Sequence, residues 1–289
     1  MDFRPATDFT AAQLAECFTK AFKGYVAGDI SFTADELVQR FALDGISTER
    51  GIVACEKGSS EPMAFSFMAL REDRPTLVRL ASFGVLPELK GKGVGTQLVA
   101  ASINAERARG TKVIELECIN QNPAGVALYK KCGFTILRDL NGWERDALSA
   151  EELQSCAETG AATELQECTI KEVRNLVREY AAEDMPWQAW AVPSSEGSKA
   201  YRLGQAYCVV SNPVDEEKDT IRLQSLIVLP EGRGKGAATT LASTILAKFP
   251  GKKWLVTAHF PKEYGVSLAK RFGFREHKLT QCQMRYQIE

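Results

Sequence analysis

Two short glycine-rich segments have the residue types of an anion-binding turn. Residues 86–98 read LPELKGKGVGTQL, and residues 229–241 read LPEGRGKGAATTL. Each follows a strand-like apolar run and leads into a helical pattern. Each therefore predicts a turn whose consecutive backbone N–H groups lie at a helix N-terminus, where a diphosphate binds well.

The repeat extends beyond these turns. Residues 125–134 (GVALYKKCGF) correspond to residues 265–274 (GVSLAKRFGF), and nearly the same spacing separates the two copies of each motif. A repeat kept over such a distance indicates a duplicated module. The sequence predicts a first domain over 1–140 and a second over 141–289, with the boundary within about 139–170.

The spacing of the glycines can be compared with two common nucleotide-binding motifs. Neither copy contains GxxxxGK[ST], which excludes a P-loop. The first copy reads GxGxG, and no acidic residue ends a following strand as a dinucleotide fingerprint requires. Glu115 and Glu117 lie near that distance, so spacing alone does not decide the matter.

Hydrophobic periodicity and turn residues predict an α/β order in each half. In the first half we expect helices at 10–23 and 33–43, strands at 51–56, 63–70 and 76–86, a helix at 96–109, a strand at 113–118, a helix at 123–131 and a strand at 134–138. Residues 139–170 predict a connector and a helix with little strand signal. The second half predicts helices at 170–181, 239–248 and 266–271, and strands at 207–211, 221–229 and 253–258.

The joint pattern of motifs in the first half resembles the GCN5-related N-acetyltransferase (GNAT) superfamily. The matching residues are Val85-Leu86-Pro87, Lys90-Gly91-Lys92-Gly93-Val94-Gly95, Asn122-Pro123-Ala124, Leu128-Tyr129 and Gly133-Phe134. The one departure is Lys90, where the family usually has Gln or Arg, and a cation remains there.

The resemblance implies two tandem GNAT-like domains, each a mixed, mostly antiparallel sheet flanked by helices. It also implies acetyl-CoA as co-substrate, with the pantetheine arm along the strand before the turn and the diphosphate on the turn. A backbone N–H near Gly84 or Val85 would hold the thioester oxygen. The residues expected to bind the co-substrate are Phe83, Gly84, Val85, Lys90, Gly91, Lys92, Gly93, Val94, Gly95, Thr96 and Asn122.

Two residues align with the family's acid and base. Tyr129 matches the residue that protonates the departing CoA thiolate, and Glu117, on a predicted strand, matches a base found in some members. A plainer interpretation stays open for both residues and for Asn122: Tyr129 as a half-buried helix aromatic, Glu117 as an exposed strand acid, and Asn122 as a helix N-cap. Cys118 could carry an acyl group, but a core cysteine and direct transfer in a ternary complex are favoured.

Acceptor recognition in this family involves the first helices and their loop. Tyr25 lies in a loop-like stretch between Gly24 and Gly28 and is our expected substrate contact.

The second half keeps the turn but not the residues around it. Its motif is Arg233-Gly234-Lys235-Gly236-Ala237-Ala238, a possible second CoA site. Ala269 replaces Tyr129, Lys262 replaces Asn122, and Thr257 replaces Glu117. This half is expected either to bind CoA silently or to support the first half structurally.

The composition limits the classes of binding partner that we expect. The net charge of -1 and the pI of about 6.3 give no signature of nucleic-acid or membrane-surface binding. No apolar run approaches the roughly 18 residues of a membrane span, and no secretory signal is visible. Eight scattered cysteines without a CxxC pair indicate reduced thiols in a cytoplasmic protein, and no metal site is predicted.

Three functions remain open at this point. The first is acetylation of a small-molecule amine, and the second is acetylation of a protein at its N-terminus or a lysine. The third is a non-catalytic CoA-binding or sensing protein, against which the pair Asn122 and Tyr129 argues.

Overall fold

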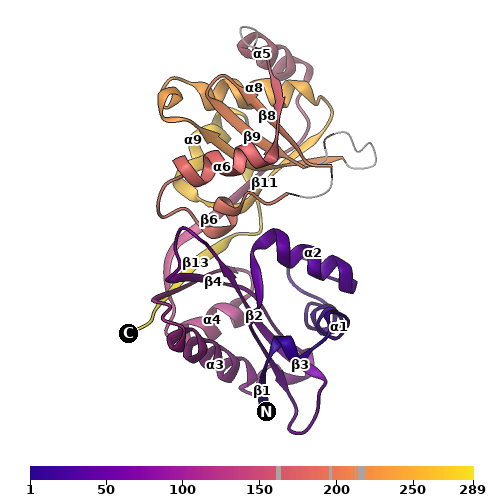
Figure 1. Cartoon of the computed structure of the whole chain (residues 1–289). Coiled ribbons are helices and arrows are strands. Elements are labelled where there is room, and N and C mark those ends of the chain that lie inside the picture. The colour runs from indigo at the N-terminus through magenta and orange to yellow at the C-terminus, as the bar shows by residue number, and fades with distance from the viewer. Residues whose placement is uncertain (161–163, 195–196, 212, 214–218) are drawn as a thin grey trace. The chain divides into compact units, whose positions relative to one another are not determined.

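The computed structural model describes residues 1–160, 164–194, 197–211, 213 and 219–289 (Figure 1). They divide into two compact units. Unit 1 consists of Met1–Arg138 and Cys282–Glu289, and unit 2 is Asp139–Gln281. The compact units differ from the expected second domain, 141–289, at the last eight positions, 282–289, which belong to unit 1. The expected boundary region, 139–170, includes residues 161–163, which lie outside the described residues.

Unit 1 alternates strands and helices. Its strands are β1 (Asp2–Pro5), β2 (Ile46–Cys55), β3 (Pro62–Leu70), β4 (Leu77–Val85), β5 (Val113–Ile119), the start of β6 (Thr135–Arg145) and β13 (Gln281–Gln287). Its helices are α1 (Ala11–Ala21), α2 (Ala34–Asp44), α3 (Val94–Ala108) and α4 (Pro123–Lys131), with short 3-10 turns η1 (Ala6–Asp8) and η2 (Pro87–Leu89).

The first two helices begin where the sequence predicts. Thr10 and Thr33 are their N-caps, and each forms a capping box, with Gln13 and Glu36 respectively. Helices α1 and α2 cover one face of the unit 1 sheet, and α3 and α4 cover the other (Figure 1). The ring of Phe18 stacks on Phe65 of β3 at 3.8 Å between centroids, which fixes the first helix on the sheet.

Strands β4 and β5 pair only at one end. Their parallel register joins Leu77–Arg79 to Val113–Glu115, after which β4 continues to Val85 and β5 to Ile119. On its other side β4 pairs with β3 as far as Ala64↔Val85, with an irregularity between Phe67 and Met68. The two strands therefore diverge at the end where the glycine-rich turn begins.

Unit 2 repeats this order with additions. Its strands are the end of β6, β7 (Gln166–Cys168), β8 (Lys199–Leu203), β9 (Ala206–Val210), β10 (Thr220–Val228), β11 (Lys253–Pro261) and β12 (Arg275–Glu276). Its helices are α5 (Ala150–Gly160), α6 (Ile170–Tyr180), α7 (Trp187–Ala191), α8 (Ala237–Lys248) and α9 (Lys262–Arg271), with the 3-10 turn η3 (Pro230–Gly232).

The parallel pair of unit 2 diverges in the same way. Strands β10 and β11 pair over Thr220–Leu223 and Lys253–Val256, and both strands continue beyond. The sequence-based prediction missed β1, β7, β8, β12, β13 and α7, and it ended β6 too early. These elements are short or, for β6, continue through polar residues, where alternation is weak.

The chain passes between the units within two strands. In unit 1 the strand order is β1-β2-β3-β4-β5-β13-β6, and in unit 2 it is β6-β11-β10-β9-β8-β7, with β12 also on β6. The chain leaves unit 1 inside β6 and returns inside β13. The C-terminal strand thus fills the position between β5 and β6 in the first unit's sheet.

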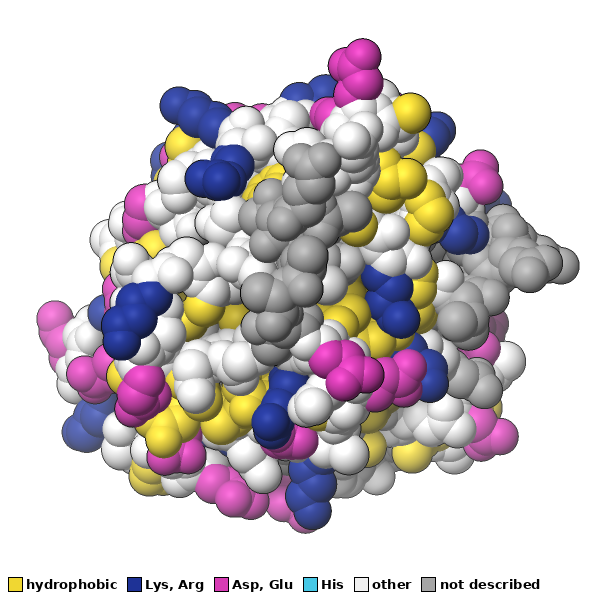
Figure 2. All heavy atoms as spheres, turned by 90° about the horizontal axis from the view of Figure 1, so that it is seen from above, with side chains coloured by type: hydrophobic (Ala, Val, Ile, Leu, Met, Phe, Trp, Pro, Cys, Tyr) yellow, Lys and Arg dark blue, Asp and Glu magenta, His cyan; other side chains and the backbone are white. Residues whose placement is uncertain are grey.

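The charged surface residues and the cysteines that the structure describes fit the composition of an ordinary globular protein. One face carries Lys and Arg side chains interspersed with Asp and Glu (Figure 2). All eight cysteines lie in described parts of the chain and are free thiols. Within the same parts, no helix combines the length and apolar character needed to cross a bilayer, and no cluster of three or more metal-binding side chains is found.

Candidate active site

The first glycine-rich turn has a backbone shaped for an anion. Gly91 and Gly93 have φ angles of 79° and 82°, which side-chain-bearing residues rarely adopt. The turn is closed by backbone hydrogen bonds from Lys90 N–H to Pro87 O and from Lys92 N–H to Leu89 O, each 3.2 Å long. The glycines and both lysines are exposed, so the turn is open to a ligand.

Helix α3 begins without a side-chain cap. Its N-cap is Gly93, which offers no oxygen to the first N–H groups, whereas Thr10, Thr33, Asn122 and Thr169 cap their helices. The donors of Val94, Gly95 and Thr96 are thus left for another acceptor. Together with the positive end of the helix dipole and the cations Lys90 and Lys92, they suit a diphosphate.

The strand end before the turn borders the divergence between β4 and β5. Gly84 is required there, because a Cβ atom would collide with the ring of Phe65 on β3. The Phe83 ring lies edge-on to the ring of Tyr129, with centroids 5.9 Å apart. The expected pantetheine strand, Phe83–Val85, therefore lies directly against the expected acid.

Tyr129 is a buried residue of α4. Its side chain is 9% exposed and packs edge-on to both Phe83 and Phe134. Burial raises the pKa of its hydroxyl well above 10, with smaller contributions from Cys118, Tyr25 and Cys132. The hydroxyl therefore keeps its proton at neutral pH and remains a donor.

Three further expected residues gather around Tyr129. Asn122 caps α4 by accepting a hydrogen bond from Gly125 N–H at 3.1 Å. Burial raises the pKa of Tyr25, the nearby Cys118 adds to this, and a hydrogen bond with the Asn122 side chain opposes it. The α1–α2 segment, β5 and α4 thus bring Tyr25, Cys118, Asn122 and Tyr129 into one cluster.

Cys118 is a poor nucleophile in this setting. Burial raises the pKa of its thiol to about 12, and the neighbouring Cys282 adds to the effect. A thiol needs its ionised form to attack a thioester. The environment of Cys118 is therefore that of a core cysteine.

Glu117 is not the exposed strand acid of the plainer interpretation. It forms an ion pair with Arg79 of β4, with 2.5 Å between Nε and Oε2, and its side chain is 2% exposed. The pairing of Arg79 with Glu117 could not be predicted from the sequence, because two parallel strands that are far apart in the chain bring these residues together. The role of Glu117 as base remains a prediction.

Glu115 lies on the same face of β5 and is held by β13. Arg285 bonds its Oε1 at 2.9 and 2.5 Å, and Gln283 donates to its Oε2 at 3.3 Å. These residues come from the opposite end of the sequence. The sequence motifs contained no signal for them.

The second turn reproduces the backbone of the first. Gly234 and Gly236 have φ angles of 71° and 81°, and Gly236 is the N-cap of α8 without a side-chain cap. Arg233, however, donates to Val228 O at 3.0 Å and to Tyr180 O at 2.7 Å. Its guanidinium is thus engaged with the end of β10 and with the end of α6.

The surroundings of the second turn differ in chemistry. Ala269 is buried where unit 1 has Tyr129, and Lys262 forms an ion pair with Glu276. Thr257 bonds His259 at 2.7 Å, and the other ring nitrogen of that histidine lies 3.3 Å from Gln224 O.

An aromatic ring also lies against α9. A Cβ atom at Gly265 would collide with the ring of Trp143 of β6, whereas at the corresponding Gly125 the nearest groups are the side chains of Asn122 and Cys118. An indole is therefore found in unit 2 where unit 1 has polar site residues.

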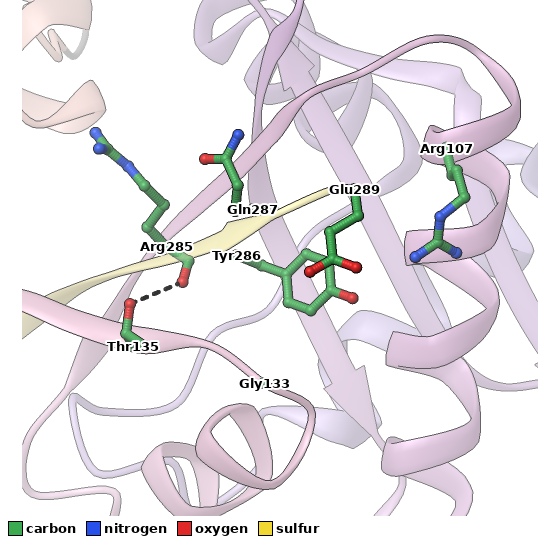
Figure 3. A pocket seen from close by; sticks show the side chains of 7 residues that line it. All are labelled: Arg107, Gly133, Thr135, Arg285, Tyr286, Gln287 and Glu289. Atoms are coloured by element: carbon green, nitrogen blue, oxygen red, sulfur yellow. Dashed lines mark hydrogen bonds between the residues drawn. The ribbon is translucent and has the colours of Figure 1, made fainter.

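A separate pocket of unit 1, about 370 Å³ in volume, lies at the far end of α3 (Figure 3). Its lining is Arg107, Gly133, Thr135, Arg285, Tyr286, Gln287 and Glu289. Because Arg107 belongs to the last turn of α3 and the glycine-rich turn precedes its first, this pocket is distinct from the predicted site.

Sequence comparison finds that the first part of the chain is similar to acetyltransferases. Residues 14–134 match the acetyltransferase (GNAT) family model. An uncharacterized N-acetyltransferase of Methanocaldococcus jannaschii is 32% identical over 59 residues, which cover 20% of this chain and 26% of that protein. N-alpha-acetyltransferase 30 of Schizosaccharomyces pombe is 32% identical over 85 residues, which cover 24% of this chain and 57% of that protein. The chain thus spans less than two thirds of either relative.

The fold of the whole chain also has a solved counterpart. A tandem GNAT protein from the clavulanic acid biosynthesis pathway aligns over 100% of this chain and 98% of its own, with a TM-score of 0.62 and 16% identity. At that identity the likeness shows the fold, which is two tandem GNAT domains with mixed sheets flanked by helices. The match to the acetyltransferase (GNAT) family model covers residues 14–134, which is less than half of the chain.

Proposed function

We propose that unit 1 transfers an acetyl group from acetyl-CoA to the primary amine of a small molecule, by direct transfer in a ternary complex. The observation that carries this proposal is the convergence of Tyr129, Asn122 and Tyr25 beside the diverging strands β4 and β5. An uncapped helix N-terminus follows the same strand. A binding module would need the uncapped turn but not a buried hydroxyl donor beside it.

The co-substrate is held mainly by backbone. The N–H groups of Val94, Gly95 and Thr96 receive the diphosphate, and Lys90 and Lys92 balance its charge. The pantetheine arm lies along Phe83–Val85, where the divergence of β5 leaves room for it. Asn122, fixed by its hydrogen bond to Gly125, orders the other wall of the cleft.

The reaction forms one bond and breaks another. The amine nitrogen attacks the thioester carbon, and a backbone N–H at Gly84 or Val85 stabilises the oxygen that becomes negative. Glu117 takes the proton from the nitrogen. As the carbon–sulfur bond breaks, Tyr129 donates its proton to the thiolate, and solvent restores it.

Direct transfer is supported by the state of Cys118. A pKa of about 12 keeps this thiol protonated at neutral pH, so it does not compete for the acetyl group. Tyr25 approaches from the α1–α2 segment, and its position beside Asn122 supports a role in contacting the acceptor.

Acetylation of a protein N-terminus is the second candidate. It is favoured by the partial match to N-alpha-acetyltransferase 30, which covers 57% of that relative. Unit 2 serves in either case as a supporting domain or a silent CoA site, because Ala269 and Lys262 replace the donor and the amide. We also propose a cytoplasmic location, which the free thiols support.

One assay separates these possibilities. The full chain is incubated with acetyl-CoA and a panel of primary amines, comprising polyamines, amino sugars, amino acids and short peptides, and thiol release is followed. We expect turnover with one class of small amine and less with the peptides. Turnover confined to peptides would favour the second candidate, and tight acetyl-CoA binding without any turnover would reduce unit 1 to a binding module.

A further inference from the structure

The side chain of Gln283 on β13 has one polar atom without a partner. The residue is 2% exposed, and its Nε2 donates to Glu115, yet among the described residues no group donates to its Oε1. The orientation is fixed, because turning the amide over would place the oxygen against the Glu115 carboxylate. A buried carbonyl oxygen without a hydrogen bond destabilises the fold, so such an atom calls for a donor.

The strand register places Gln283 opposite Glu117. Ile288 N–H donates to Lys112 O at 2.8 Å, which sets residue 288 opposite residue 112 just beyond the ends of the neighbouring strands β13 and β5. Counting inward along this antiparallel pair sets Arg285 opposite Glu115 and Gln283 opposite Glu117. The short bonds between Arg285 and Glu115 and the effect of Cys282 on Cys118 agree with this register.

The alternation of side chains along β13 shows on which face of the sheet Gln283 lies. Figure 3 shows the side chains of Arg285 and Tyr286 leaving the strand in opposite directions. Tyr286 packs with the α3 and α4 core, so Gln283 and Arg285 share the other face with Glu115 and Glu117. This is the face on which α1 and α2 lie.

We propose that Gln283 Oε1 and Glu117 together hold the acceptor nitrogen during acetyl transfer. This inference rests on the proposed function. A neutral primary amine has two N–H donors and one lone pair. One N–H bonded to Glu117 and the other to Gln283 leave the lone pair directed at the thioester carbon. Arg79, in contact with Glu117, disfavours a second cation there, so the amine is held in its neutral, reactive form.

The protons move as they do in the proposed acetyl transfer. Attack forms the carbon–nitrogen bond and makes the nitrogen cationic, and Glu117 accepts one of its protons. Gln283 exchanges no proton and keeps the remaining N–H. It is an acceptor-binding group supplied by the last strand of the chain, and it favours acceptors with two N–H groups.

Gln283→Met tests this role, because methionine keeps the length of the side chain and removes the oxygen. With acetyl-CoA saturating, we expect the KM for the best amine to rise about threefold to tenfold, the effect of one lost hydrogen bond, while the KM for acetyl-CoA stays unchanged. The control is Arg285→Met, which also loosens Glu115 but leaves Oε1 in place. It should raise the KM for the amine less.

A substrate series gives a readout that a structural role would not change. The parent chain should prefer the primary amine to its N-methyl derivative, which has one N–H fewer when neutral, and Gln283→Met should reduce this preference. An unchanged preference, or equal effects of the two variants, overturns the proposal while leaving the acetyltransferase function in place. No turnover by the parent with any amine would instead remove the proposed function and this inference with it.

Discussion

The two glycine-rich turns differ less in backbone than in what surrounds them. Both have two glycines at positive φ, the same pattern of backbone hydrogen bonds and an uncapped helix after them. Around the first lie Tyr129 and Asn122, and around the second lie Ala269 and an indole ring. A turn that binds an anion through backbone N–H groups tolerates many side-chain changes, whereas the ability to donate a proton is lost when one residue changes.

The cations of the turns show a second difference. Arg233 is bonded to two backbone carbonyls, one of them at Val228, the counterpart of Val85 on the expected pantetheine strand. The corresponding Lys90 is exposed. In unit 2 the arginine therefore stabilises the turn and the adjoining strand, a function that needs no ligand.

The largest expected effect comes from changing each turn separately. Gly93→Val places a branched side chain at a φ of 82° and disturbs the N–H groups expected to bind the diphosphate. Loss of two charge-assisted hydrogen bonds would weaken acetyl-CoA binding by about a thousandfold, measured by calorimetry. The matched variant Gly236→Val should leave this affinity unchanged. If it alone weakened binding, the assignment of the two units would be reversed.

The next effect concerns the acid. Tyr129→Phe keeps the ring packing with Phe83 and Phe134 and removes only the hydroxyl, so we expect kcat to fall by about a hundredfold with the KM for acetyl-CoA unchanged. Tyr264→Phe, on an exposed residue of α9, is the control and should have full activity. Full activity of Tyr129→Phe would favour the interpretation of Tyr129 as a packing residue.

A smaller effect is expected for the base. Glu117→Gln keeps an oxygen for Arg79 but accepts no proton, and kcat/KM should fall roughly tenfold to a hundredfold. Thr257→Val tests the corresponding position of unit 2 and should not change turnover. Thermal melts of both variants show whether the buried ion pair, rather than chemistry, is responsible. An active Glu117→Gln chain would contradict the role.

The smallest effect is on stability at alkaline pH. The pKa of Tyr129 in the folded chain lies above its unfolded value near 10, because burial favours the neutral hydroxyl. Its contribution is complete below about pH 10 and is lost as the pH rises toward the folded pKa, since only the unfolded chain ionises. Between about pH 10 and 11, urea unfolding of Tyr129→Phe should therefore lose up to about 1.4 kcal/mol less than the parent. Parallel losses in the two chains would mean that the hydroxyl is hydrated in the folded state.

Local signals of the sequence predicted the helices well. Thr10, Thr33 and Asn122 begin α1, α2 and α4 as their capping chemistry indicates. The glycines at 91 and 93 likewise take the positive φ angles that a tight turn requires. Helix caps and turns depend on neighbours within a few positions, so they can be predicted without knowledge of the tertiary structure.

The unpredicted features all depend on distant pairing. Arg79 reaches Glu117 across two parallel strands, and Gln283 and Arg285 reach Glu115 from the last strand. The register of strands far apart in sequence is set by packing, which single-sequence patterns do not encode. For this reason the charged partners of the predicted base were found only in the structure.

The return of β13 to unit 1 has a consequence for synthesis. A ribosome releases β5 and the start of β6 long before Cys282, and at about 5–20 residues per second the delay is on the order of ten seconds or more. During that time the two strands lack the partner that lies between them, and unpaired strand edges invite association with other chains. We therefore expect chaperone dependence during translation. A chain that stops before Cys282 would lack the strand between β5 and β6, so under the proposed function we expect unit 1 to become active only after β13 has been synthesised.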